Sequence, residues 1–171
     1  MTTIAEYLFS DHRLAKLGRP EADALRERDA LSDAAILDFK YDATLLTLWV
    51  LFDCRGTLNM RDGNVAIIVA NNVTSLQWSA PPVKRRIWRS VSRSNPELTS
   101  QHFNMTINFE LSVADNGESL SFSCTTAEFH VGDIPGGDEA PPDFSDDSDE
   151  EIRAGLASWD SPFTPIHSST I

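Results

Sequence analysis

The chain has 171 residues, of which 41% are hydrophobic, with two cysteines and a formal net charge of −12. This length predicts one domain, and the hydrophobic content is sufficient for a core, which excludes a wholly disordered chain. No stretch approaches the ~20 apolar residues of a membrane span, and residues 1–10 lack the pattern of a signal peptide, so we expect a cytoplasmic protein.

The acidic charge is concentrated in one segment. Residues 133–151 hold nine acidic side chains and no Lys or Arg. Without those nine, 17 acidic residues face 14 basic ones, so the rest of the chain is close to neutral. The acidic segment is also rich in Gly, Pro and Ser, which predicts a disordered linker over 132–151 after a single globular domain over 1–131.

The N-terminal part, residues 1–31, is expected to be helical. Apolar residues recur at helical spacing over 2–17, and a second short helix is expected over 20–31. Leu25 and Leu31 are the large apolar contacts of that second helix.

Two hairpins are expected next. The first joins 35–41 to 46–54 and pairs Tyr41 with Leu46; its second strand is apolar on both faces and needs cover, which the N-terminal helix can supply. The second turns at Asn71–Asn72 and pairs Ile67 with Leu76, because Asn tolerates the left-handed region.

The clearest strand pattern runs from Phe103 to Val131. Strict alternation precedes Asn116–Gly117, which favours a type I′ turn and pairs Phe109 with Cys124 and Ile107 with Thr126. The apolar face switches near Thr126 to Glu128, which predicts a β-bulge. Together these patterns predict a mainly β (α+β) fold, with antiparallel hairpins that form a curled sheet or a β-sandwich.

Residues 83–94 are expected to form a short basic amphipathic helix, because Val83, Ile87 and Val91 recur at helical spacing. Its polar side would offer a partner-binding surface made of Arg85, Arg86, Trp88, Arg89 and Arg93.

The C-terminal tail, residues 152–171, carries apolar residues every three or four positions. A docking helix of about ten residues is expected there, limited by Pro162. Its partner-binding side chains would be Leu156, Trp159 and Phe163. The acidic segment could fold back on the basic helix, or it could serve only to keep the protein soluble.

The sequence offers few groups for chemistry. The histidines have no metal-ligand spacing, and no nucleophile, phosphate-loop or zinc-protease motif is present, so we expect no enzyme, no metal and no cofactor. Cys54 and Cys124 fall on apolar strand faces and are expected to be core thiols. The total charge opposes nucleic-acid binding. Glu128, His130 and His102 mark the sheet rim, where we expect a binding surface.

One local pattern resembles a known class of proteins. The residues Leu31-Ser32-Asp33-Ala34-Ala35-Ile36-Leu37, followed by Tyr41-Asp42 and Leu46-Thr47-Leu48, are similar to the opening of small bacterial β-rich immunity proteins that neutralise polymorphic toxins. Ser32 stands where that family has a histidine, so the role of that histidine has no carrier here. The resemblance implies a small cytoplasmic protein that binds another protein.

We therefore expect a non-enzymatic protein-binding domain, with immunity or inhibition as the specific function. The alternative is an accessory or regulatory module that docks through its acidic, amphipathic C-terminal tail. The third reading is an enzyme whose site is assembled from residues far apart in the sequence.

Overall fold

The protein is mainly β, as the sequence predicts. The computed structural model describes residues 1–14, 17–80, 88–109, 117–137 and 139–171. In these residues nine strands form one antiparallel sheet in the order β4-β7-β6-β5-β1-β2-β3-β8-β9. The strands are β1 (Ala35–Asp42), β2 (Thr47–Asp53), β3 (Val65–Asn71), β4 (Ser75–Ser79), β5 (Arg89–Leu98), β6 (Phe103–Phe109), β7 (Ser119–Cys124), β8 (Thr126–Asp133) and β9 (Thr164–Thr170); the helices are α1 (Ile4–Leu8), α2 (Asp149–Gly155) and the 3₁₀ helix η1 (Asp11–Leu14).

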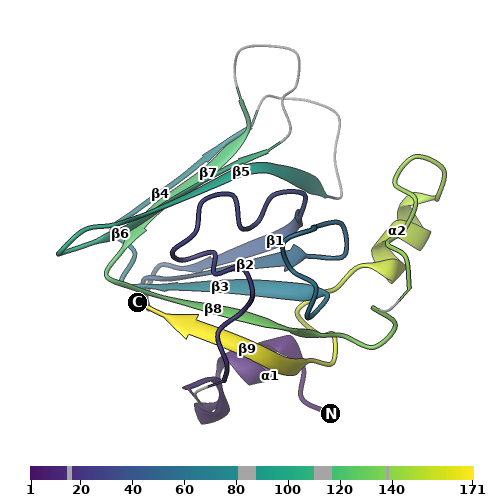
Figure 1. Ribbon diagram of the computed structural model, residues 1–171, viewed down its shortest axis with the longest axis horizontal. Coiled ribbons are helices and arrows are strands. Elements are labelled where there is room, and N and C mark those ends of the chain that lie inside the picture. The colour runs from purple at the N-terminus through teal and green to yellow at the C-terminus, as the bar shows by residue number, and fades with distance from the viewer. Residues whose placement is uncertain (15–16, 81–87, 110–116, 138) are drawn as a thin grey trace.

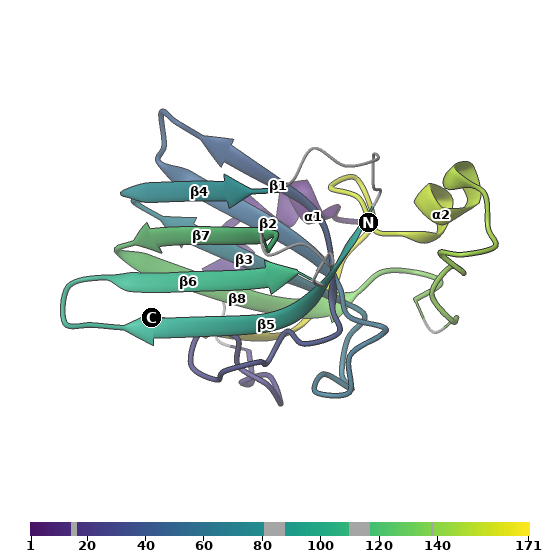
Figure 2. The ribbon, with the colours of Figure 1, turned by 90° about the horizontal axis from the view of Figure 1, so that it is seen from above.

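The sheet curls so that its two halves face each other (Figure 1). Strands β4, β7, β6 and β5 form the upper layer of that view, above β1, β2, β3, β8 and β9. The halves are joined by a short pairing of β5 with β1, at Ser90–Ala35 and Arg89–Ile36. Figure 2 shows the upper strands lying across the fan of lower strands. The sheet is not closed, and β4 and β9 are its two edges.

The main core lies between the layers, and a second core lies under the lower layer. Strand β2 is buried along its whole length because its side chains alternate between the main core and the second core. Leu48, Val50 and Phe52 enter the main core, whereas Trp49 and Leu51 join the second one. Helix α1 packs there, so the expectation that the N-terminal helix covers β2 is confirmed. The helix is shorter than the predicted 2–17.

The β1–β2 hairpin forms, but its register differs from the prediction by two residues. Tyr41 lies opposite Leu48 instead of Leu46. The turn is longer because the Asp42 carboxylate accepts hydrogen bonds from the backbone N–H groups of Thr44 and Leu45, and Leu46 has a positive φ of 52°. From Asp38 to Asp42 this even shift keeps each side chain on its expected face. The register changes between Ile36 and Asp38, so Leu37 packs on the second core, on the opposite face of the sheet from Phe39.

The predicted hairpin at Asn71–Asn72 is wrong. Asn72 does adopt a positive φ of 54°, but the chain then crosses from the lower to the upper layer. Strand β3 pairs with β2 and β8, and β4 pairs with β7 instead. Leu76 therefore lies opposite Phe122, not Ile67.

The β6–β7 pairing is confirmed, with a register six residues from the expected one. Ile107 lies opposite Leu120, and Phe103 lies opposite Cys124. The predicted turn residue Asn116 lies outside the described residues. Because the shift is even, apolar side chains still meet on one face. No bulge is needed at Thr126, since the chain leaves β7 there and begins β8 in the other layer.

Residues 20–31 do not form the expected helix. Asp29 and Asp33 have positive φ values of 59° and 66°, which ends a right-handed helix. The backbone N–H of Asp29 donates to the Ser94 carbonyl, and that of Asp33 donates to the Val91 carbonyl. This segment therefore runs along β5 where β5 diverges from β1. Leu25 and Leu31 are buried in the main core, as expected from their apolar character.

The predicted basic helix over 83–94 is wrong where the structure describes it. Residues 89–94 belong to strand β5, and Val91 and Ser94 lie opposite Phe109 and Ile107 of β6. Residues 81–87 lie outside the described residues. Cross-strand pairing with β6 has overridden the helical spacing of the apolar residues.

Disorder of the acidic C-terminal segment is not confirmed. Helix α2 begins after Ser148, whose side chain forms a capping box with Glu151. Strand β9 then adds to the sheet along β8. Trp159 and Phe163 are buried in the second core, so the tail docks on its own chain.

Candidate functional site

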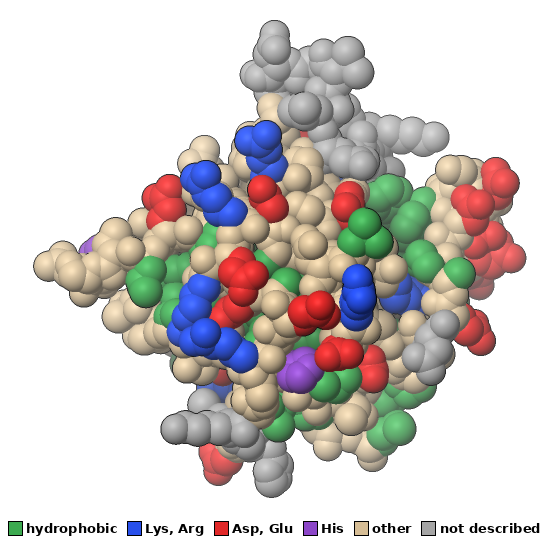
Figure 3. Space-filling model, viewed as in Figure 1, with side chains coloured by type: hydrophobic (Ala, Val, Ile, Leu, Met, Phe, Trp, Pro, Cys, Tyr) green, Lys and Arg blue, Asp and Glu red, His purple; other side chains and the backbone are tan. Residues whose placement is uncertain are grey.

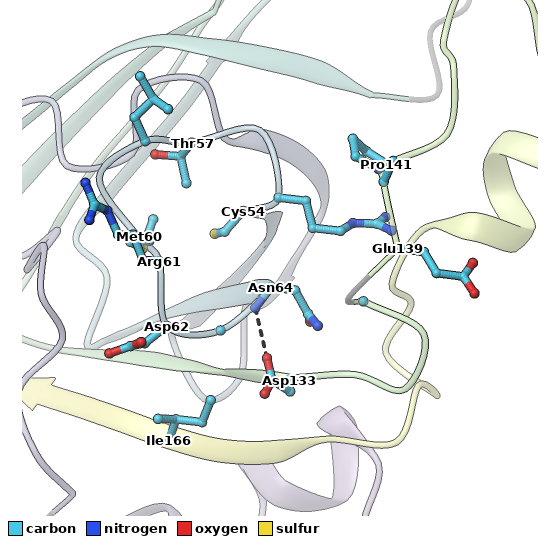
Figure 4. Close-up of a pocket in the computed structure, with 15 residues that line it drawn as sticks. Cys54, Thr57, Met60, Arg61, Asp62, Asn64, Asp133, Glu139, Pro141 and Ile166 are labelled. Atoms are coloured by element: carbon cyan, nitrogen blue, oxygen red, sulfur yellow. Dashed lines mark hydrogen bonds between the residues drawn. The ribbon is translucent and has the colours of Figure 1, made fainter.

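Two adjoining hollows lie between the β2–β3 loop and the acidic segment. Their volumes are about 730 Å³ and 470 Å³, and both are lined by Arg55, Glu139 and Ala140. We call them together the Arg55 cleft. In Figure 4, Arg61 and Asp62 of the β2–β3 loop lie on one side of the first hollow, and Glu139 and Pro141 lie on the other.

Asn64 ties the two walls of the cleft together. Its backbone N–H donates to Oδ1 of Asp133 at 3.2 Å (Figure 4). Its side-chain oxygen accepts from the backbone N–H of Ile134 at 2.9 Å. Its amide nitrogen donates to the carbonyl of Ile134 at 3.3 Å. A Cβ at Gly137 would collide with the Asn64 side chain, so the acidic segment passes as close as a glycine permits.

Arg55 stands between the two hollows and is already neutralised. Its guanidinium binds the buried Asp53 carboxylate through Nε and Nη2, at 2.9 Å and 2.6 Å from Oδ2. Nη2 also donates to the carbonyl of Gly155 at the end of α2, at 2.7 Å. Arg55 therefore anchors α2 to the end of β2, and its charge is not available to balance the cleft.

The cleft is acidic. Its described lining contains five carboxylates and two guanidinium groups: Asp62, Asp133, Glu139, Asp147 and Glu151 against Arg55 and Arg61. Further exposed carboxylates lie on and beside α2, where Figure 3 shows acidic side chains gathered at one end of the molecule. A hollow lined by one sign of charge raises the local concentration of counter-charged groups. The arrangement suits a cationic ligand.

A second polar cluster is buried beneath α1. The Tyr7 hydroxyl lies 3.1 Å from Nδ1 of His130, and Nε2 of His130 lies 3.0 Å from Oε2 of Glu128. The same carboxylate lies 2.8 Å from Nε of Arg13 and accepts from the Asn71 amide at 3.2 Å. The Tyr7–His130 and His130–Glu128 bonds form together when Tyr7 donates to His130 and His130 donates to Glu128.

Burial and neighbouring charges shift the ionisation of this cluster. Burial by itself would raise the pKa of Glu128, but the hydrogen bond with His130 and the charge of Arg13 hold it below the usual value. Burial, together with the Glu128 charge, raises the pKa of Tyr7 to about 12. His130 and Glu128 are only 1% and 7% exposed, so the cluster connects α1 to β8 and presents little surface to a substrate.

The predicted rim surface is therefore only partly assembled. Glu128 and His130 are brought together, but inside the protein. His102 lies in the exposed turn between β5 and β6, where its backbone N–H donates to the Thr99 hydroxyl. No common surface joins these three side chains.

The predicted basic surface is dispersed. Arg85 and Arg86 lie outside the described residues. Arg89 binds the fully buried Glu118 at 2.8 Å and lies over the Trp78 ring, 5.1 Å from its centre. Arg93 is exposed on β5.

Of the two alternatives for the acidic segment, folding back on the basic stretch has a counterpart in the structure. Trp88 packs against Phe144 of the acidic segment, with ring centres 4.0 Å apart and planes inclined by 33°. Among the described residues, Arg89 binds Glu118, and neither Arg89 nor Arg93 forms an ion pair with that segment. The contact is therefore aromatic, a signal that the charge pattern did not contain.

The predicted tail residues lie at the cleft and in the second core. Leu156 is half-buried and lines the smaller hollow. The Trp159 indole donates to Oδ2 of Asp38 at 2.6 Å, and Phe163 packs on Tyr7 with ring centres 5.1 Å apart. Sequence reasoning missed Arg55 and Glu139, since only the fold brings their segments together.

The two cysteines are buried, as expected. Cys54 lines the larger hollow, but burial and the neighbouring Asp53 raise the pKa of its thiol well above the usual value. Burial also raises the pKa of Cys124 to about 11. Both thiols are therefore held in the protonated, unreactive form.

In the part of the chain that the structure describes, no group of three His, Cys, Asp or Glu side chains could hold a metal ion. Within the same residues, no helix is long and apolar enough to cross a membrane. The chain matches no protein-family model, no curated protein and no solved structure.

Proposed function

We propose that this protein is a non-enzymatic protein-binding domain that holds a basic partner protein in the Arg55 cleft and inhibits it, as an immunity protein does. One observation carries the proposal: the acidic segment is fixed against the β2–β3 loop and encloses two hollows lined by an excess of carboxylates. A fixed wall lets a partner bind without the entropic cost of ordering the segment.

The electrostatics support a cationic partner. The ion pair of Arg55 with Asp53 removes one of the two positive charges of the lining, so Arg61 alone opposes five carboxylates. Lys and Arg side chains of a partner would recover hydrogen bonds there, since carboxylates accept charge-assisted bonds. The net charge of −12 would also accelerate encounter with a basic protein.

The alternative function, docking through the C-terminal tail, is less well supported. Its apolar side chains Trp159 and Phe163 are buried in the second core. Binding a partner through them would require the tail to detach, with loss of the Trp159–Asp38 hydrogen bond.

A pair of variants with the same change in net charge tests the cleft. Glu139 lines both hollows, whereas Glu150 lies on α2 and does not contribute to the described lining of either. A partner is first captured with the full chain and then titrated by calorimetry against each variant. We expect Glu139→Lys to weaken binding at least about tenfold and Glu150→Lys to weaken it only about twofold, mainly at low salt.

Equal losses in the two variants would show that only the overall charge matters and would remove the cleft from the proposal. Inhibition is tested separately, by adding the chain to the active partner. We expect activity to disappear at a one-to-one ratio. A partner that stays active in the complex would exclude the inhibitory role but not the binding.

A further inference from the structure

The two edges of the sheet are treated differently. At the β9 edge, Pro165 removes a backbone donor, and Gly18 pairs with His167 alongside the strand. The backbone N–H of Ser168 donates to the Gly18 carbonyl at 3.1 Å, and Arg26 donates to the carbonyl of Thr170. The protein's own chain therefore covers this edge. Proteins commonly cover an edge strand in this way, which prevents a strand of another molecule from pairing with it.

The β4 edge has no such cover among the described residues. Strand β4 is the first in the sheet order, so β7 is its one neighbour there. Four of its five residues are exposed. Residues 71–80 carry no charged side chain and no proline, although a charge or a proline is the usual device that blocks an edge. Within the part of the chain that the structure describes, the outer backbone groups of β4 are therefore available for pairing.

From this we infer that two copies of the chain associate through antiparallel pairing of their β4 strands. The sequence of β4, Ser75-Leu76-Gln77-Trp78-Ser79, is self-complementary about its centre. With Gln77 on the two-fold axis, Leu76 of each copy lies opposite Trp78 of the other. Each apolar side chain then meets an apolar side chain, and each polar one meets a polar one.

The inner face of β4 extends the main core toward this edge. Leu76 packs against the core, and Trp78 contacts Phe39 and Phe109 with ring centres 5.3 Å and 5.5 Å away. Trp78 is nevertheless 37% exposed. Two Leu76–Trp78 contacts across the axis would bury the remaining apolar surface, which supplies the driving force for association.

Charge explains why this edge suits a second copy. Each chain carries −12, so two copies repel wherever their acidic surfaces meet. The outer face beside β4 carries hydroxyl and amide groups, as in the cross-strand row Gln77, Ser121 and Thr106. Helix α2, whose acidic residues are exposed, lies far along the molecule from β4 (Figure 1). The uncharged edge brings two copies together where repulsion is least.

The pairing is short, and this limits its strength. Strand β4 has five residues, so the interface falls in the range below about 1,200 Å² that is typical of weak complexes. We therefore expect a concentration-dependent equilibrium between monomer and dimer. Sedimentation of the full chain over a wide concentration range should show the dimer accumulate.

Matched substitutions locate the interface. Gln77→Lys places two like charges on the two-fold axis, whereas Gln101→Lys makes the same change in the exposed β5–β6 turn. We expect the first to weaken the dimer at least about tenfold and the second to leave it unchanged, with circular dichroism showing both variants folded.

Disulfide trapping tests the two-fold axis directly. In Gln77→Cys the two new thiols face each other, so oxidised glutathione should convert the chain to a covalent dimer, taking up two electrons and two protons as two glutathione thiols. Gln101→Cys should form mainly the mixed disulfide with glutathione. A chain that stays monomeric at all concentrations, or equal cross-linking of the two variants, would overturn the inference.

Discussion

The Tyr7 hydroxyl lies 3.1 Å from Nδ1 of His130, although 123 residues separate the two in sequence. Their rings also meet edge to face, with centres 5.4 Å apart. Since Tyr7 belongs to α1 and His130 to β8, this contact fixes the N-terminal helix to the lower layer. The cover that β2 needs thus depends on a polar bond as well as on apolar burial.

Replacement of Tyr7 by Phe tests that bond. The ring would still pack on Phe163, but Nδ1 of His130 would lose its partner inside the protein. We expect the free energy of unfolding to fall by about 1 to 3 kcal/mol, the usual range for a buried group left unsatisfied. Urea denaturation measures it. Tyr41→Phe, at a position that is 39% exposed, is the control and should change stability by less than about 0.5 kcal/mol.

The depressed pKa of Glu128 predicts acid sensitivity. Because the folded-state pKa lies below the unfolded value of about 4.3, the carboxylate contributes stability above that value and loses its contribution as the pH falls through the folded pKa. Glu128→Gln removes this dependence. We expect the variant to be less stable at neutral pH but to lose less on acidification, as thermal unfolding at a series of pH values would show.

The prediction is supported if the stability of Glu128→Gln falls less steeply with decreasing pH than that of the parent. The same profile in variant and parent would mean that other carboxylates govern acid unfolding. Glu150→Gln serves as the control because Glu150 is exposed on α2, and its side chain makes no hydrogen bond among the described residues.

The two thiols should resist modification in the folded protein. The pKa of Cys124 is raised to about 11 by burial, so its thiolate is scarce at neutral pH. We expect an aromatic disulfide reagent to label both cysteines at a rate set by unfolding, and to label them rapidly in urea. Fast labelling of one thiol without urea would contradict the burial of Cys54 or Cys124.

Stability should also fall when the pH rises far enough to ionise Cys124. The raised folded-state pKa means that its contribution is complete below the unfolded thiol value of about 8.5 and disappears as the pH rises through about 11. In thermal unfolding at a series of alkaline pH values, Cys124→Ala or Cys124→Val should lose less stability than the parent, and the remaining loss would include the contribution of Cys54.

Arg55 should be important for the whole cleft. Replacement by Met would leave the Asp53 carboxylate, which is 4% exposed, without its ion pair. We expect a loss of about 3 to 5 kcal/mol, typical of a buried charge left without its partner. The loss of the bond to the Gly155 carbonyl should also expose the acidic segment to proteases. Arg61→Met, in the same loop, should leave stability and proteolysis nearly unchanged.

Strand existence could be predicted well from the sequence, whereas strand partners could not. The alternation in Phe103–Phe109 predicts β6 correctly, and Ser119–Cys124 was rightly expected to pair with it. Turn residues such as Asn72 were also informative, since it does adopt a positive φ. Yet a turn residue does not say whether the chain reverses within one layer or crosses to the other, because both need the same local backbone.

The candidate site illustrates the same limit. Neither Arg55 nor Glu139 belongs to a motif, and they meet because the acidic segment returns to the β2–β3 loop. Local composition favoured disorder for that segment. However, Trp159 and Phe163 are buried in the second core, and this burial holds the chain that precedes them against the body. Composition rules omit such long-range burial, which offsets the entropy of ordering.

The sequence by itself determined that this protein has a mainly β, antiparallel fold, two core thiols and a helix covering β2. These features follow from side-chain periodicity, which is local. The tertiary structure alone decided that β7 and β8 lie in different layers and that Asp53 neutralises Arg55. It also decided that residues near Gly18 and Arg26 cover the β9 edge, while the described residues leave the β4 edge uncovered. Those outcomes depend on which distant apolar surfaces are buried together. That choice is set by the free energies of alternative whole folds, which the sequence of one segment does not determine.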